Sequence, residues 1–134
     1  MRPRLVGLQR FGYQWLPALC WMALIFLLSS FSFGFAWFRK AQKNHADWAA
    51  HVVEYSFLGF LLARALWRHH FFWRRTGRLW PAVFLISLVY AVSDEIHQHF
   101  VPNRDASVYD CVADTFGAMI GAWLWLKKQR SFNA

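Results

Sequence analysis

Five acidic side chains fall inside or beside long apolar stretches of this chain, where an ionisable group is costly unless it is paired, hydrated or bound to a cation. They are Glu54, Asp94, Glu95, Asp110 and Asp114. Carboxylates bind hard divalent cations and can exchange protons during a reaction. Arg104 lies close to them in the sequence, but one guanidinium cannot neutralise five negative charges. The surplus predicts protonated carboxyls, an open hydrated cavity, or a bound cation such as Mg²⁺ or Mn²⁺.

The spacing of the polar residues predicts shared helix faces, because residues three or four apart lie on the same side of a helix. The sets with this spacing are His51 with Glu54 and Tyr55, Asp94 with Gln98, and Asp110 with Asp114. Such faces should point into a bundle, since a carboxylate that faces lipid is strongly unfavourable. Ser29 and Ser30, at the end of the first apolar stretch, are expected to reach the same depth.

We assign these residues to three predicted roles. The predicted catalytic residues are His51, Glu54, Asp94, Glu95 and Asp110, with His51 as acid, base or ligand. The predicted substrate-binding residues are Arg104, Gln98, Ser107, Asp114, Ser30 and Tyr55, with Arg104 placed to receive a phosphate or carboxylate. A hypothetical metal site would use Glu54, Asp94, Glu95 and Asp110.

Structural roles account for several of these residues when each is taken singly. Ser107-x-x-Asp110 fits a capping box at the start of a helix. Other structural pairs would be His51 with Glu54, and Asp94 or Glu95 with Arg104. The convergence of polar groups from four helices at one depth favours a functional site over separate structural roles.

Four stretches of roughly 20 mostly apolar residues are long enough to cross a membrane as helices. They cover about residues 16–38, 46–67, 79–100 and 107–126. Gly117 and Gly121 form a Gly-x-x-x-Gly pattern, which allows two membrane helices to approach closely. The predicted fold class is therefore all-α, with residues 1–134 forming one domain, an integral membrane bundle of four transmembrane helices.

The distribution of charge predicts how the bundle is oriented. Basic residues concentrate in the N-terminal tail, in residues 64–78 and in the C-terminal tail, and fewer lie in residues 39–43 and at Arg104. The positive-inside rule therefore places both termini in the cytoplasm, with all seven acidic residues toward the outer side. This asymmetry, with attraction to anionic headgroups at the cytoplasmic face, explains the net charge of +8, so no nucleic acid partner is expected.

One block of the chain carries a family pattern. It runs Ser93-Asp94-Glu95-Ile96-His97-Gln98-His99-Phe100-Val101-Pro102-Asn103-Arg104 and continues through Ser107, Asp110, Asp114, Gly117 and Gly121. The pattern resembles the VanZ-like membrane protein family, named after a protein linked to teicoplanin resistance. Asp114 stands where that family more often has Asn, and Asn103 where Gly is common. The resemblance implies a multi-pass protein of the prokaryotic cytoplasmic (inner) membrane connected with the cell envelope or antibiotic resistance, and it implies no particular reaction.

Three functions fit these residues. The first is an enzyme that processes a lipid-linked substrate, phosphorylated or glycosylated, at the outer leaflet. The second is a non-catalytic protein that binds such a headgroup and modulates envelope properties or glycopeptide susceptibility. The third, a proton or cation pathway, is less favoured, because Arg64 is the one ionisable group deep on the cytoplasmic side. The sequence leaves open whether the chain is an enzyme and what its oligomeric state is.

Overall fold

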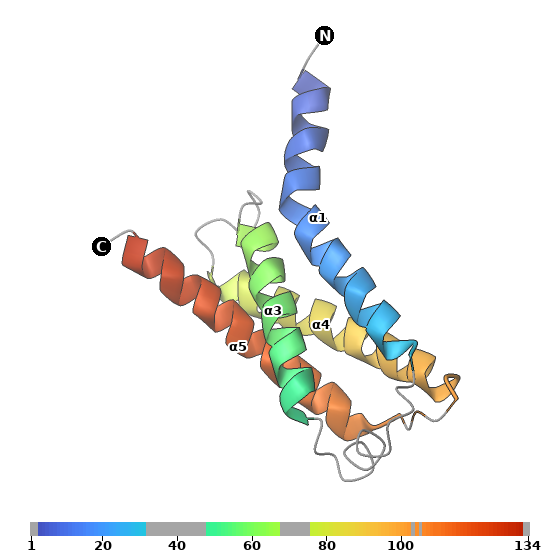
Figure 1. Cartoon of the computed structure of the whole chain (residues 1–134). Coiled ribbons are helices and arrows are strands. Elements are labelled where there is room, and N and C mark those ends of the chain that lie inside the picture. Colours follow the sequence, from blue (N-terminus) through green and yellow to red (C-terminus); the bar gives the residue numbers. More distant parts are fainter. Residues whose placement is uncertain (1–2, 32–47, 68–75, 103, 105, 133–134) are drawn as a thin grey trace.

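The computed structural model describes residues 3–31, 48–67, 76–102, 104 and 106–132. Over these residues the predicted all-α architecture is confirmed. The helices are α1 (Pro3–Ser29), α3 (Trp48–Trp67), α4 (Thr76–His99) and α5 (Val108–Phe132). Successive helices run in opposite directions, so the C-terminal ends of α1 and α4 meet the N-terminal ends of α3 and α5 at the bottom of Figure 1.

The first helix differs from its predicted bounds. It begins at Pro3, well before residue 16, and ends at Ser29. Proline is favoured in the first turn of a helix, where its missing N–H costs nothing, so the helix can start within the basic tail. Residues 32–38 of the predicted first span lie outside the described residues, as do the predicted loop residues 39–43.

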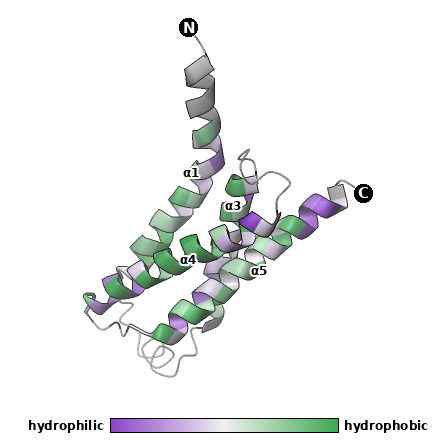
Figure 2. Ribbon diagram, turned by 180° about the vertical axis from the view of Figure 1, so that it is seen from behind, coloured by the Kyte–Doolittle hydropathy of each residue, from purple (hydrophilic) through white to green (hydrophobic). Residues whose placement is uncertain are grey.

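Three helical segments are long and apolar enough to cross a membrane. They are Phe11–Ser29, Trp48–Trp67 and Gly77–His99. Helix α5 has 25 residues, a length of about 37 Å at 1.5 Å per residue, but it carries acidic residues near its start and basic residues near its end. Figure 2 shows this contrast, with hydrophobic colour along α4 and hydrophilic colour at the C-terminal end of α5.

Helix α3 contacts each of the other three helices, as α4 also does. Its contact with α5 is the closest in the molecule and depends on glycine. A Cβ atom added to Gly121 would lie 1.8 Å from the Ser56 carbonyl oxygen, and one added to Gly117 would lie 2.4 Å from the Val52 carbonyl oxygen. The Gly-x-x-x-Gly prediction of close helix approach is therefore confirmed, and α3 is the partner.

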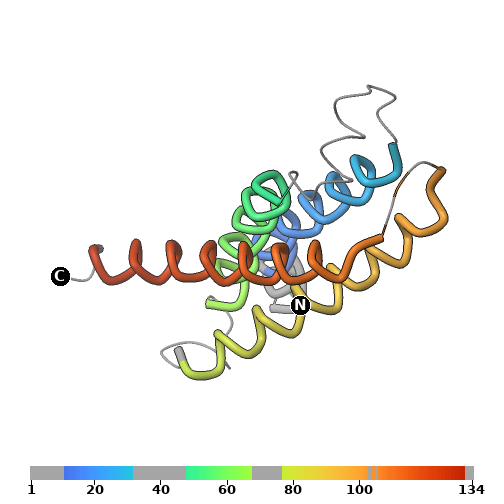
Figure 3. The backbone as a smooth tube through the Cα atoms, turned by 90° about the horizontal axis from the view of Figure 1, so that it is seen from below, coloured from blue at the N-terminus to red at the C-terminus, as the bar shows by residue number. Residues whose placement is uncertain are grey.

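Helix α5 also packs against α4, to which it is joined by the short connection after His99. Figure 3, viewed from below, shows α4 and α5 crossing obliquely. The outward faces of the helices carry exposed apolar side chains, among them Val53, Val89 and Phe116, which are 68%, 68% and 61% exposed. Such a surface suits contact with lipid hydrocarbon.

Candidate functional site

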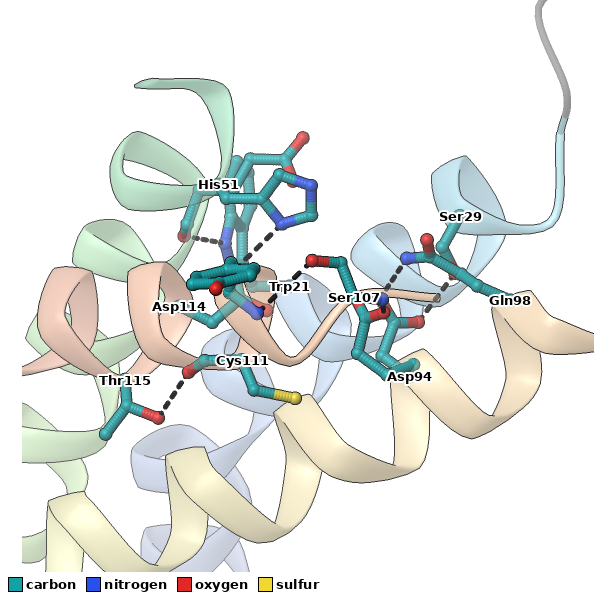
Figure 4. A network of polar contacts seen from close by, with 12 residues as sticks. Trp21, Ser29, His51, Asp94, Gln98, Ser107, Cys111, Asp114 and Thr115 are labelled. Carbon is teal, nitrogen blue, oxygen red and sulfur yellow. Dashed lines mark hydrogen bonds and ion pairs between the residues drawn. The ribbon is translucent and has the colours of Figure 1, made fainter. Parts of the chain in front are cut away.

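Asp94 is the centre of a small polar cavity between α1, α3 and α4. The carboxylate is 3% exposed and accepts hydrogen bonds from Ser29 Oγ at 2.6 Å and from Gln98 Nε2 at 3.0 Å, as Figure 4 shows. The cavity has a volume of about 140 Å³, and we call it the Asp94 pocket. Its polar lining consists of Ser29, His51, Glu54, Tyr55, Asp94, Gln98 and Arg104.

The second feature is a buried pair between α3 and α5. His51 Nδ1 lies 3.0 Å from Asp114 Oδ1, and the two side chains are 12% and 0% exposed. The spacing of His51 and Glu54 allowed a pair within α3; the structure brings the His51 ring to Asp114 of α5. An imidazole that donates from Nδ1 to a carboxylate carries its acceptor lone pair on Nε2. Because His51 also lines the Asp94 pocket, the pair connects α5 to that cavity.

Glu95 follows Asp94 directly but has different partners. Its Oε2 accepts a hydrogen bond from the Ser107 backbone N–H at 2.6 Å, whereas Ser107 Oγ accepts one from the Tyr109 N–H at 3.2 Å. Ser107 therefore caps α5, as the capping-box pattern predicted. In a complete capping box the Asp110 side chain would accept the backbone N–H of Ser107, but here Glu95 of α4 accepts it. Asp110 lies in the first turn of α5, where a carboxylate complements the helix dipole.

Arg104 holds the end of α1 while lining the Asp94 pocket. Its Nη2 donates to the carbonyl oxygens of Leu28 and Phe31, each at 3.2 Å. These carbonyls belong to the last turn of α1 and the residues after it, where a helix leaves acceptors without partners. Arg104 thus lines the pocket and also fixes the end of α1.

Two further predicted binding residues, Ser30 and Tyr55, differ in their relation to the Asp94 pocket. Ser30 Oγ lies 2.9 Å from His97 Nε2 and donates to the Phe26 carbonyl oxygen at 2.7 Å, so Ser29 rather than Ser30 bonds the central carboxylate. Tyr55 lines the pocket and is 1% exposed, and its buried hydroxyl has no hydrogen-bond partner among the described residues.

The four predicted metal ligands do not form one cluster. Asp94 lies in the Asp94 pocket with Glu54, whereas Glu95 lines a separate groove between α4 and α5. Within the described part of the chain, no group of three or more His, Cys, Asp or Glu side chains is arranged to hold a metal ion. The described geometry does not fit the four-carboxylate site, and binding of Mg²⁺ or Mn²⁺ stays a prediction.

Sequence reasoning did not assign two residues that attach α1 to the site. Trp21 Nε1 donates to the Glu54 carbonyl oxygen at 3.0 Å, and the Tyr90 hydroxyl donates to the Met22 carbonyl oxygen at 2.5 Å. The sequence contained a feature that could have identified each of these two residues. Trp21 is the one Trp placed well inside a predicted span, and Tyr90 precedes Asp94 by four residues, on the same helix face.

Comparison with known proteins identifies a family. The family model described as VanZ/LLP1 matches residues 14–129, which include every residue of the Asp94 pocket and both members of the His51–Asp114 pair. No curated protein and no solved structure matches the chain.

Proposed function

The chain belongs to the VanZ/LLP1 family, and from this premise we propose that it binds the headgroup of a lipid-linked envelope substrate, phosphorylated or glycosylated, in the Asp94 pocket. The protein has four transmembrane helices in this proposal and lies in the prokaryotic cytoplasmic (inner) membrane. Both termini are cytoplasmic, and the Asp94 pocket lies in the outer leaflet.

The arrangement of charge supports this topology. Among the described residues, Arg64 lies in the last turn of α3, Arg78 lies in the first turn of α4, and the last turns of α5 carry Lys127, Lys128 and Arg130. These ends lie together at the end of the bundle opposite the Asp94 pocket. The positive-inside rule assigns the end that carries these Lys and Arg residues to the cytoplasm.

The faces of α5 support its role as the fourth span. Asp114 is buried against α3, whereas Val112 and Phe116, on the opposite side, are 58% and 61% exposed. A membrane helix must direct its ionisable side chains into the bundle and its apolar side chains toward lipid. Helix α5 satisfies this requirement although its average composition is less apolar than that of the other helices.

The observation that carries the binding proposal is the chemistry of one buried cavity. The Asp94 pocket combines carboxylates with the Arg104 guanidinium, the His51 ring and the Tyr55 hydroxyl. A guanidinium recognises phosphate, and carboxylates accept hydrogen bonds from sugar hydroxyls. A few converging polar groups in a largely apolar setting are typical of ligand sites.

The His51–Asp114 pair supports processing of the bound lipid. A carboxylate that accepts from Nδ1 holds the imidazole in one tautomer and stabilises the imidazolium that forms when Nε2 takes a proton. His51 is therefore placed to serve as general acid or base for a molecule in the Asp94 pocket, with Asp114 as its positioning residue.

A non-catalytic role in modulating the envelope is the second candidate. The observation that favours it is that both carboxylate oxygens of Asp94 already accept hydrogen bonds from Ser29 and Gln98. A carboxylate held in this way is well suited to fixing the shape of a binding pocket. In this case a headgroup binds and leaves unchanged.

Binding and turnover separate these candidates. The purified full chain would be titrated with polyprenyl phosphate, a phospholipid and a glycolipid, with complexes counted by native mass spectrometry. We expect one lipid to bind preferentially, with affinity roughly tenfold weaker in Asp94→Asn, as for loss of one charge-assisted hydrogen bond. Ser93→Ala is the matched control, because Ser93 is exposed on the same helix and bonds its own backbone at Tyr90.

Product release is measured in the same samples, with and without Mg²⁺ or Mn²⁺. Turnover that His51→Gln abolishes while binding remains would establish processing. Binding without product, in the presence of either cation, would establish the non-catalytic role. Equal, weak binding of all three lipids by wild type and Asp94→Asn would contradict the proposal.

A further inference from the structure

A second cavity, larger than the Asp94 pocket, lies between α4 and α5. It is a groove of about 840 Å³, within the range of roughly 300–1,000 Å³ typical of ligand sites. Its apolar walls are two stripes of side chains spaced three or four apart. The stripes are Phe84, Leu88 and Val92 on α4, and Val112, Phe116 and Met119 on α5.

The groove is long enough to cover one leaflet of a bilayer. From Phe84 to His99 it follows fifteen residue steps of α4, a length of about 22 Å at 1.5 Å per residue. Half of a hydrocarbon core that is about 30 Å thick is about 15 Å. Val92 and Val112 at the rim are 42% and 58% exposed, so the groove opens sideways toward lipid. An extended hydrocarbon chain can therefore enter it from the membrane.

The outer end of the groove is polar. Glu95, His99 and Ser107 line it there, where α4 ends and α5 begins. Glu95 is 6% exposed; its Oε2 accepts the Ser107 N–H, whereas its Oε1 is buried without a hydrogen-bond partner among the described residues. A buried carboxylate oxygen without a donor is costly in an apolar setting, so a ligand that brings a donor is favoured there.

We infer that the α4–α5 groove binds the hydrocarbon chain of a membrane lipid whose headgroup donates a hydrogen bond, from a hydroxyl or an ammonium, to Glu95 Oε1. Charge complementarity selects a donor over an anion, because acidic Glu95 lines this end of the groove and Asp110 lies in the first turn of α5 beside it. The inference rests on the proposed function and deepens it. It says that the hydrocarbon chain of the bound lipid occupies the α4–α5 groove and that its headgroup carries a hydrogen-bond donor.

A diazirine-bearing alkyl chain tests this inference. The full chain would be reconstituted in phosphatidylcholine nanodiscs, whose lipid has no hydroxyl or N–H donor. Three probes with the same C16 chain and mid-chain diazirine would be added, namely the alcohol, the primary amine and the methyl ether. We expect the alcohol and the amine to crosslink to α4 and α5 residues of the groove roughly tenfold more than the ether does.

Substitutions identify the groups responsible. Glu95→Gln keeps an acceptor oxygen but removes the charge, so we expect a roughly tenfold loss of amine crosslinking and a smaller loss for the alcohol. Val92→Trp fills the groove without altering Glu95 and should abolish crosslinking of both probes. Its matched control is Val89→Trp, because Val89 is exposed on α4 and does not line the groove.

Several results would overturn the inference. Equal crosslinking of the three probes would exclude selection of a donor by Glu95, and crosslinking unchanged in Val92→Trp would exclude a chain site in the groove. A change of oligomeric state in Val92→Trp, without probe crosslinks in wild type, would show that a second copy fills the groove. If wild type showed no crosslinks in the groove but still bound lipid at the Asp94 pocket, this inference alone would be refuted. Groove crosslinking with no Asp94-dependent binding would refute the proposed function alone.

Discussion

The two sides of α3 are joined to their neighbours by different physical means. On the α5 side the backbones are in contact, because Gly59, Gly117 and Gly121 leave no room for a Cβ atom. On the α1 side, hydrogen bonds add to the packing of side chains: the Trp21 indole donates to the backbone carbonyl of Glu54, and its ring centroid lies 4.5 Å from that of Phe57. A contact formed by fitted backbones tolerates almost no added volume, whereas a hydrogen-bonded contact can be altered one bond at a time. The site thus combines a rigid pair of helices with a third helix held by polar contacts.

The largest expected effect is at the α3–α5 contact. Gly121→Ala places a methyl group 1.8 Å from the Ser56 carbonyl oxygen and 2.7 Å from the Phe60 nitrogen, so the two helices must separate. We expect the free energy of unfolding to fall by about 3 kcal/mol or more, at or beyond the upper end for overpacking. Unfolding by SDS titration of the reconstituted protein measures this change.

Gly77→Ala is the control for that substitution, since a Cβ atom on Gly77 would meet no atom within 4 Å. Alanine favours helix over glycine, so this variant should be unchanged or slightly more stable. Equal behaviour of the two variants would contradict the description of α3 and α5 as a close-packed pair.

An intermediate effect is expected where the rigid pair carries a buried polar contact. Asp114→Ala leaves the His51 ring without its carboxylate in a buried position and should cost about 1–3 kcal/mol of stability. A cycle with His51→Ala and the double variant isolates the coupling between the two side chains. Coupling of about 1 kcal/mol or more is expected, and additive effects would show that the pair contributes no interaction of its own.

The smallest effect is expected on the α1 side. Ser29→Ala removes one of the two hydrogen bonds to Asp94 and should lower stability by about 1 kcal/mol. Thermal unfolding in detergent is sensitive to a change of this size. Ser93→Ala, on the exposed face of α4, is expected to be neutral; a larger loss in that control than in Ser29→Ala would contradict the described contact between α1 and α4.

Helix periodicity was enough to predict which residues share a face, but not how those faces meet. The interior position of Asp94, Gln98 and Asp114 followed from spacing and from the cost of a carboxylate in lipid. The spacing did not predict that Asp94 and Glu95 line different cavities, although consecutive residues on a helix point about 100° apart. This difference depends on where α5 crosses α4, which no local pattern specifies.

The two serines at the end of α1 show the same limit. Both were expected at the depth of the site, yet the rotation of α1 directs Ser29 to Asp94 and Ser30 to His97. The sequence likewise did not predict that Glu95 caps α5. The capping-box pattern lies within residues 107–110, whereas the group that accepts the Ser107 N–H belongs to another helix. Local signals identified the participants, and only tertiary packing assigned their partners.

The composition of lipids that copurify with the chain tests most directly whether the Asp94 pocket binds a lipid headgroup. Wild type, Asp94→Asn and Ser93→Ala would be purified in the same mild detergent, and their bound lipids compared with the lipids of the whole membrane by mass spectrometry. We predict that one class of phosphorylated or glycosylated lipid is enriched with wild type and Ser93→Ala, and that the enrichment falls roughly tenfold in Asp94→Asn. Bound lipids that mirror the bulk membrane in all three proteins would contradict it.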